Sequence, residues 1–216
     1  MSEPAPPARP RWAESHPRLT RYYDEEWGIP VWDERGLFER LSLEVFQAGL
    51  SWLTVLQKRD AFRSAFADFE PGRVAAFSSR DVERLLSDAA IIRNRRKIEA
   101  TIHNARATMA LRDAGESLAA LVWSAMPERS PCVRTDAELP VSSPESAALA
   151  AALQQRGFSR VGPITMFALL TAIGVVDGHL AGSHRRGSSG LWQADGTRSA
   201  LAIPSHLRKT PATATS

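Results

Sequence analysis

Three side chains able to recognise a flat, polar ring lie close together in the chain. Glu44 and Gln47 stand among apolar and aromatic residues, and Trp52 follows a few positions later. On a helix, residues three apart share a face, so we expect the carboxylate and the amide to point into one pocket. An aromatic face with polar groups at the ring edge suits a purine flipped out of duplex DNA, and a cationic alkylated base gains further from the carboxylate. The alternative is structural, with Glu44 capping a helix or pairing with an arginine and Trp52 in the core.

An aromatic and acidic segment precedes these residues. It starts at Trp12 and continues with Tyr22-Tyr23-Asp24-Glu25-Glu26-Trp27-Gly28. Its acidic groups exclude it from a DNA-facing surface, because they would repel phosphate. We expect Tyr22 to line the pocket or the segment to brace it from behind. A surface strap whose tryptophans dock on the core is equally consistent with the pattern.

A third stretch is suited to binding an anion. The chain reads Gly157-Phe158-Ser159-Arg160-Val161-Gly162-Pro163-Ile164-Thr165 before an apolar helical segment. A glycine hairpin that opens a helix presents unpaired backbone N–H groups and the positive end of the helix dipole. DNA phosphate is the candidate anion, although many such turns are plain connections. The predicted contacts to the DNA backbone are Arg160, Val161, Gly162 and Thr165.

Two further features extend this hypothesis. The helix after the hairpin stops at Gly174 and delivers Asp177 beyond its end. A carboxylate there could stabilise a positively charged sugar or orient water, and it could equally cap a neighbouring helix. Arg93 opens a run of four cations in five residues at the start of a long predicted helix, where cations oppose the dipole. Phosphate contact and an ordinary solvated face both explain this run.

The elements that must position these residues are predicted to be helices. The chain has 216 residues, of which 44% are hydrophobic, so it can bury a sizeable core. Apolar residues recur at helical spacing almost throughout, and Ser78 and Ser143 mark helix starts. We predict an all-α protein with a disordered leader at 1–10, a folded domain at 11–185 that includes a long connection over 127–140, and a flexible basic tail at 186–216.

Composition narrows the class of protein. The single Cys132 excludes an internal disulfide framework and a thiol-pair metal site, and it indicates a reducing compartment. No apolar run approaches the roughly 20 residues that span a bilayer, and the start lacks the apolar region of a signal peptide. We therefore expect a cytoplasmic, nucleoid-associated protein without membrane contact. Basic residues concentrate after Arg156, near the hairpin, which favours a nucleic-acid partner.

Taken together, the motifs resemble the 3-methyladenine DNA glycosylase I family of the helix-hairpin-helix glycosylase superfamily. The resemblance covers about residues 9–183. The block from Gln47 to Trp52 is specific to that family, whereas the hairpin is shared across the superfamily. The remaining matching segments are Tyr22–Gly28, Leu43-Glu44, Ile91-Ile92-Arg93 with Lys97-Ile98, and Arg156-Gly157-Phe158 with Val161-Gly162.

The resemblance implies a two-lobed, all-α helix-hairpin-helix fold with the lesion pocket in the cleft between the lobes. It implies hydrolysis of the N-glycosidic bond of 3-methyladenine in double-stranded DNA, which leaves an abasic site. In such a pocket Glu44 would accept hydrogen bonds from the base edge, and Tyr22, Trp52 and Trp12 would stack on the ring. No lysine nucleophile is evident beside the hairpin, so we expect no lyase activity. We expect a monomer acting on duplex DNA that contains alkylated bases.

Two departures from the family pattern stand out. The family commonly holds a structural zinc with two cysteines and two histidines, but the corresponding positions here read Pro10, Tyr23, His179 and Ser183. One imidazole cannot hold zinc, so we predict no metal or other cofactor, with the termini joined by packing through Tyr23. The second departure is Asp177. It stands where related superfamily members place a catalytic aspartate and where this family typically has Asn, so it is a candidate catalytic residue beside Glu44.

Two other functions are compatible with the same residues. One is a catalytically degenerate helix-hairpin-helix protein that still binds DNA. Retention of Glu44, Gln47 and Trp52 argues against it, because binding of the DNA backbone alone would not need them. The other is a helical interaction protein with no nucleic-acid role, which salt-insensitive or absent binding to duplex DNA would favour.

Overall fold

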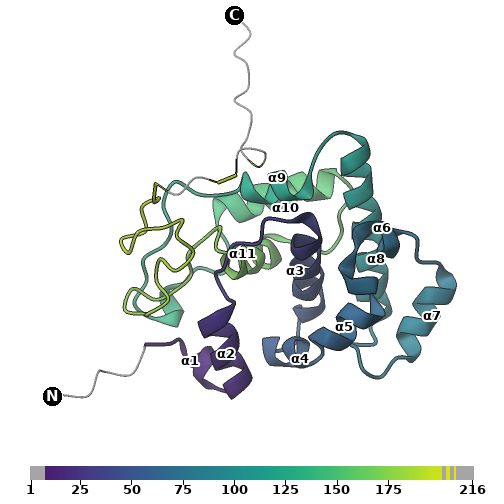
Figure 1. Cartoon of the computed structure of the whole chain (residues 1–216), viewed down its shortest axis with the longest axis horizontal. Helices are drawn as coiled ribbons and strands as arrows, with labels where there is room; N and C mark the ends of the chain where they lie inside the picture. The colour runs from purple at the N-terminus through teal and green to yellow at the C-terminus, as the bar shows by residue number, and fades with distance from the viewer. Residues whose placement is uncertain (1–7, 201–202, 205–206, 208–216) are drawn as a thin grey trace, which may run out of the picture.

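The protein is helical throughout. The computed structural model describes residues 8–200, 203–204 and 207. Over these residues eleven α-helices and two short 3₁₀ helices follow one another, and backbone pairing outside them is limited to two isolated bridges with no β-strand (Figure 1). The prediction of an all-α protein is confirmed. None of the helices in the described ranges is long and apolar enough to cross a membrane.

The first half of the chain builds helices around a long central one, α3 (Glu34–Gln47). The others are α1 (Arg11–Glu14), α2 (Pro17–Glu25), α4 (Trp52–Gln57), α5 (Arg59–Ala65), the 3₁₀ helix η1 (Ala67–Phe69), α6 (Pro71–Ala75) and α7 (Ser79–Ser87). Local capping sets several starts. Asp33 accepts a hydrogen bond from the Gly36 amide before α3, and Ser78 and Asp81 form the predicted capping box before α7.

The second half contributes α8 (Arg95–Asp113), α9 (Leu118–Trp123), the 3₁₀ helix η2 (Asp136–Glu138), α10 (Pro144–Gln155) and α11 (Pro163–Ala172). Ser143 caps α10, as predicted. Gly174 follows the end of α11 with φ of 73°, a left-handed conformation that favours glycine and ends the helix. Residues 127–140 form the predicted long connection, in which η2 is the one helical turn.

Two apolar clusters hold these helices together. In the larger one α3 contacts α8, α9 and α11, while α8 packs on α6 and α10 packs on α11 (Figure 1). Its largest fully buried side chains include Phe38, Phe46, Phe62, Phe66, Phe69 and Trp123. The smaller cluster joins α1, α2 and α4 to the C-terminal end of α11. It consists of Ala13, Leu19, Tyr22, Tyr23, Trp27, Leu56 and Ala172.

The prediction of a flexible tail from residue 186 is wrong for residues 186–200. This stretch packs on the left of the molecule in Figure 1 and buries Leu191 and Trp192 in the larger cluster. Nε1 of Trp192 donates to the Gly174 carbonyl at 3.1 Å, and Nε of Arg198 donates to the Pro127 carbonyl at 2.9 Å. The segment has no helical periodicity from which its order could be predicted. Irregular hydrogen bonds and two anchoring apolar residues, Leu191 and Trp192, hold it in place instead. The rest of the predicted tail lies outside the described residues, apart from 203, 204 and 207.

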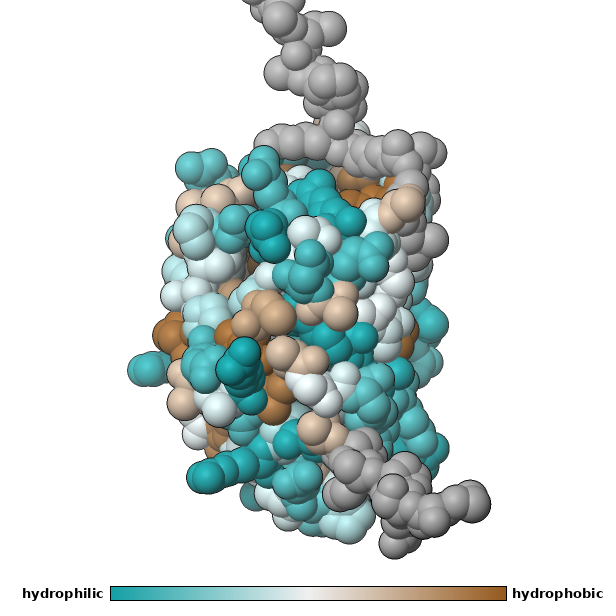
Figure 2. Space-filling view, turned by 90° about the vertical axis from the view of Figure 1, so that its left-hand side faces the viewer, coloured by the Kyte–Doolittle hydropathy of each residue, from teal (hydrophilic) through white to brown (hydrophobic). Residues whose placement is uncertain are grey.

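The predicted disordered leader at residues 1–10 also needs correction at its C-terminal end. Residues 1–7 of the predicted leader lie outside the described residues, but Arg9 and Pro10 are placed. Arg9 makes a bidentate contact with Asp24, with Nε–Oδ1 and Nη2–Oδ2 distances of 2.9 and 2.8 Å, and Pro10 is buried. Figure 2 shows the face on the left of Figure 1. This face is mainly hydrophilic, with small hydrophobic areas between hydrophilic groups.

Candidate functional site

A cavity of about 500 Å³ opens where α1, α2, α3, α4 and α11 meet. All five side chains predicted to contact a base line it, namely Trp12, Tyr22, Glu44, Gln47 and Trp52. Sequence reasoning missed the other lining residues, which are Ser15, Leu19, Trp27, Leu50, Ser51, Leu53, Ala168 and Thr171. The fold therefore closes a pocket of ligand size from segments that are far apart in the sequence.

Aromatic rings form much of the wall. The rings of Tyr22 and Trp52 lie 5.3 Å apart between centroids and are tilted by 49°, and Trp12 contacts Trp27 edge to face at 5.5 Å. These distances are those of favourable aromatic pairs, so the rings hold one another in place. Nε1 of Trp52 is buried without a hydrogen-bond partner among the described residues. Trp52 thus contributes an aromatic ring to the cavity wall.

Glu44 supplies the one carboxylate among the residues that line the cavity. It lies in the last turn of α3, it is only 6% exposed, and no described residue hydrogen-bonds its carboxylate. Burial raises the pKa of Glu44 to about 8, against the opposing charge of Arg40. Among the described residues Glu44 neither caps a helix nor forms a direct ion pair with an arginine, as the structural alternative would require, although the charge of Arg40 acts on it from a distance. The carboxylate remains available to a ligand.

The turn between α3 and α4 is held by a buried lysine. Nζ of Lys97 donates to the carbonyls of Phe46 and Ala48 at 2.7 and 2.6 Å and so satisfies the C-terminal end of α3. Gly49 follows with φ of 79°, and Ser51 caps α4 and starts the segment that carries Trp52. Lys97 belonged to the predicted run of cations, but the structure uses it inside the protein.

The glycine hairpin between α10 and α11 exposes a row of backbone donors. Among the described residues no hydrogen bond is made by the backbone N–H groups of Arg160, Val161, Gly162, Ile164 and Thr165. Arg160 itself has a left-handed φ of 57°, which turns the chain at this point. Unsatisfied amides at the start of the ten-residue helix α11 are suited to an anion.

Asn104 of α8 fixes the hairpin in place. Its Nδ2 donates to the Ser159 carbonyl at 3.1 Å, and its Oδ1 accepts from the Ser159 amide at 2.8 Å. A ring nitrogen of His103 lies 2.5 Å from the Gly157 carbonyl. Sequence reasoning missed Asn104, although a buried polar residue between apolar helical positions is a recognisable signal, because such a group needs a partner.

Exposed arginines accompany the hairpin. Arg95 forms ion pairs with Glu83 and Glu99, whereas Arg93 and Arg96 are exposed and make no side-chain contact of this kind in the described part of the chain. Arg160 and Arg96 line one shallow hollow between the hairpin and α8. Positive charge therefore lies beside the free hairpin amides, and Arg93 remains a predicted phosphate contact at the start of α8.

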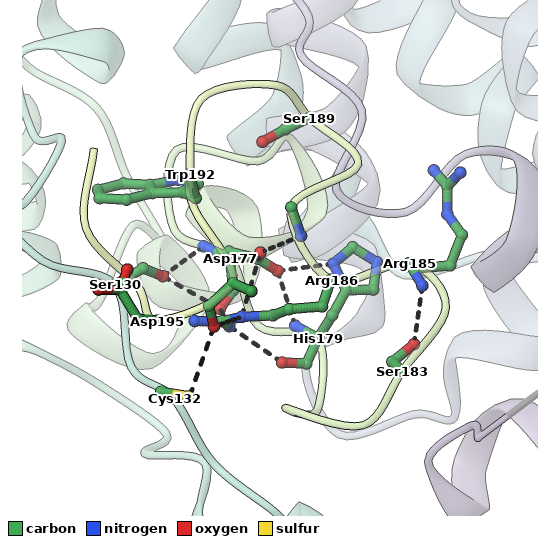
Figure 3. A network of polar contacts seen from close by, with 12 residues as sticks. Ser130, Cys132, Asp177, His179, Ser183, Arg185, Arg186, Ser189, Trp192 and Asp195 are labelled. Carbon is green, nitrogen blue, oxygen red and sulfur yellow. Dashed lines mark hydrogen bonds and ion pairs between the residues drawn. The ribbon is translucent and has the colours of Figure 1, made fainter. Parts of the chain in front are cut away.

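The structure places Asp177 away from the cavity, in a polar network (Figure 3). Oδ1 lies 2.7 Å from Nδ1 of His179, while Oδ2 accepts the Gly187 amide at 2.8 Å and lies 3.6 Å from Nε of Arg186. Burial alone would raise the pKa of Asp177, but His179, the Gly187 amide and Arg186 together hold it below its ordinary value. A buried carboxylate with both oxygens engaged argues against the predicted catalytic role. It organises the segment that follows α11.

The four positions that would correspond to zinc ligands do not form a metal site. The Tyr23 hydroxyl hydrogen-bonds the Ser183 hydroxyl at 2.6 Å, and the rings of Tyr23 and His179 meet edge to face at 5.2 Å. Pro10 has no ligating side chain, and no group of three or more His, Cys, Asp or Glu in the described residues is placed to hold a metal. The donor set does not fit zinc. Tyr23 and Ser183 link the two ends of the chain directly.

These elements define a helical protein in which α11 connects a hairpin with free backbone amides to an aromatic cavity that contains a buried carboxylate. A family model described as methyladenine glycosylase matches residues 12–186. The chain therefore belongs to the methyladenine glycosylase family.

Known relatives match this chain over nearly their whole length. DNA-3-methyladenine glycosylase 1 of Escherichia coli is 43% identical over 173 residues, which are 79% of this chain and 92% of that protein. A crystal structure of 3-methyladenine DNA glycosylase I superposes with a TM-score of 0.79 at 44% identity, covering 82% of this chain and 98% of the other. The Staphylococcus aureus enzyme, whose structure concerns recognition of 3-methyladenine, superposes with a TM-score of 0.73 at 34% identity, covering 77% and 89%.

Proposed function

We propose that this protein is a base-excision repair glycosylase that hydrolyses the N-glycosidic bond of 3-methyladenine in duplex DNA and leaves an abasic site. The observation that carries the proposal is the buried, unpartnered Glu44 carboxylate in an aromatic cavity. Relatives at 40–43% identity bear this name, and the S. aureus structure concerns the same base. The proposal includes a monomer that acts in the cytoplasm at the nucleoid.

The chemistry needs little acid catalysis, because the methylated base in DNA is already a cation. The bond between the base and C1′ of the sugar breaks, its electron pair leaves with the base, and the base becomes neutral. Water then adds its oxygen to C1′ and releases a proton to solvent. The protein accelerates this step by binding the flipped cationic base, with Glu44 accepting hydrogen bonds at the ring edge and the rings of Tyr22, Trp12 and Trp52 on its faces.

The raised pKa of Glu44 couples binding to proton release. Its pKa of about 8 means that the empty pocket holds a largely protonated acid at neutral pH. A cation beside it favours the ionised form, so binding of a charged base should drive off the proton. We expect activity to fall as pH decreases below the value at which Glu44 ionises.

The hairpin would hold the DNA while the base occupies the cavity. Helix α11 carries the free amides at its first turn, and its residues Ala168 and Thr171 line the cavity. At about 1.5 Å per residue, Thr171 stands roughly 12 Å along the helix from Pro163, so one rigid element sets the distance from phosphate to base. Val161, Gly162 and Thr165 then act through their amides, and Arg160 adds charge.

The proposal contains no lyase step. Of the lysines in the sequence, Lys97 is committed to two backbone carbonyls, Lys58 donates to the carbonyls of Ala89 and Ala90, and neither lines the cavity. Lys209 lies outside the described residues. An amine nucleophile for the abasic sugar is therefore not offered by the described part of the chain.

Release of free bases from methylated duplex DNA, resolved by chromatography, tests the function. We expect the wild type to release 3-methyladenine and Glu44→Gln to lose about 10- to 100-fold in kcat/KM, the value of a hydrogen bond to a charged group. Glu128→Gln, a change at an exposed carboxylate, is the matched control. A folded wild type that binds duplex DNA without releasing any base would support the degenerate DNA-binding function instead.

A further inference from the structure

An ion-pair cluster stands directly behind the base pocket. Nη2 of Arg40 and Nη1 of Arg59 both lie 2.5 Å from the same oxygen, Oε1 of Glu26. The side chains of Arg40, Arg59 and Glu26 are only 15%, 18% and 25% exposed. Nη1 of Arg40 is buried with no hydrogen-bond partner in the described residues. A cluster so far removed from water needs a reason beyond surface solubility.

The position of Arg40 on α3 supplies that reason. Arg40 precedes Glu44 by four residues, so the two side chains occupy the same face on successive turns, about 6 Å apart along the axis. Tyr22 of α2 lines both the cavity that contains Glu44 and an outer hollow lined by Glu26 and Arg59. The other walls of the cavity, from α4 and α11, contribute no charged side chain.

We propose that Arg40 is a positioning residue of the base pocket: its ion pair with Glu26 fixes a positive charge one turn before Glu44 and favours the ionised form of Glu44, which accepts hydrogen bonds from a cationic base. The inference rests on the function proposed above. Glu26 has the complementary role, because it offsets one of the two positive charges of the cluster and so limits repulsion between Arg40 and the bound cation.

Arg40 has two opposite effects on the binding of a cationic base: it favours the ionised form of Glu44, and it repels the cation. The two effects can be separated by varying the pH. Burial raises the pKa of Glu44, and the charge of Arg40 opposes this rise. Without Arg40 the pKa rises further, and each unit lowers the ionised fraction at neutral pH about tenfold. Above that pKa Glu44 is ionised in either protein, and loss of a nearby positive charge then leaves binding of a cation equal or tighter. The two pH profiles should therefore converge or cross.

The direct test follows the Glu44 carboxyl carbon by ¹³C NMR as a function of pH in the free protein. We expect the midpoint to rise by about one pH unit in Arg40→Gln, to return near the wild-type value in Arg40→Lys, and to stay unchanged in Arg35→Gln, an exposed position on the same helix. Arg40→Met, which keeps an apolar stem, replaces Arg40→Gln if the latter does not fold. A midpoint that stays or falls in the folded variant overturns the inference.

The second test measures 3-methyladenine release between pH 6 and 9.5. We expect kcat/KM of Arg40→Gln to be about tenfold below wild type at pH 7 and to reach or exceed it at the alkaline end. A uniform loss at every pH would indicate a merely structural Arg40 and would refute the inference. If the wild type released no base, the proposed function would fail, while the NMR titration would still decide whether Arg40 controls the charge of Glu44.

Discussion

Replacement of Asp177 by asparagine should destabilise the protein and leave its chemistry intact. The carboxylate pairs with Arg186 and His179, whose side chains, like that of Asp177, are each 2% exposed. Asparagine keeps the shape and one acceptor. Its NH₂ group, however, must face either the Gly187 amide, which donates to Oδ2, or the His179 atoms at Oδ1. The guanidinium of Arg186 would also lose the nearby negative charge.

The size of the effect follows from these contacts. Removal of one partner of a buried ion pair costs about 3–5 kcal/mol, and because asparagine retains one acceptor we expect a value near the lower end, about 3 kcal/mol. For a domain of this size each kcal/mol lowers Tm by about 2–4 °C, so Tm should fall by about 6–12 °C.

The effect should depend on pH in a defined direction. The pKa of Asp177 is lower in the folded protein than its ordinary value of 3.8. A depressed carboxyl pKa contributes stability above the unfolded pKa, and this contribution is lost as pH falls through the folded pKa. The difference in Tm between wild type and Asp177→Asn should therefore be constant between about pH 5 and 8 and should shrink below about pH 4.

Thermal unfolding followed by circular dichroism, together with base release at a temperature where both proteins are folded, checks this prediction. Asp60→Asn, at an aspartate whose side chain is 94% exposed, is the matched control and should leave Tm unchanged. The reasoning would be refuted by an unchanged Tm in Asp177→Asn combined with a large loss of kcat, because that result would place the carboxylate at the reacting sugar.

Two further substitutions test the hairpin and the junction between the chain ends. Asn104→Ala removes both contacts to Ser159, so duplex affinity measured by fluorescence anisotropy should fall about 10-fold while the affinity for free 3-methyladenine stays unchanged; equal loss of both would contradict a local role. Gly28→Ala should lower stability by more than about 1 kcal/mol in urea unfolding, because φ is 79° there and a Cβ would lie 2.4 Å from Cε1 of His179. An unchanged urea midpoint would show that His179 and the backbone around Gly28 can shift to accommodate the Cβ without loss of stability.

The sequence predicted the features that depend on local spacing. Apolar periodicity indicated the helices, Ser78 and Ser143 marked the starts of α7 and α10, and Gly174 marked the end of α11. These signals work because a cap or a glycine stop involves only a few consecutive residues. Glu44 and Gln47 also share a face for a local reason, the period of the helix.

Other features could not be predicted, because they depend on irregular segments or on partners distant in sequence. Asp177 was predicted as a candidate catalytic carboxylate or, equally, as a helix cap, and the irregular segment after α11 brings His179, Arg186 and the Gly187 amide onto its oxygens. Lys97 read as one of several surface cations, yet its amine satisfies carbonyls about 50 residues away, with separations of 51 and 49 residues. The segment 186–200 read as a tail because its two anchoring residues, Leu191 and Trp192, leave no periodic pattern.

The sequence by itself determined the helical class, the family and the five pocket side chains Trp12, Tyr22, Glu44, Gln47 and Trp52. Only the tertiary structure decided how burial and neighbouring charges change the properties of these side chains. The pKa of Glu44 depends on how much water the surrounding helices exclude, and on the charge of Arg40, which pairs with Glu26 just after the end of α2. Burial and long-range pairing are properties of the assembled fold, so no local pattern encodes them.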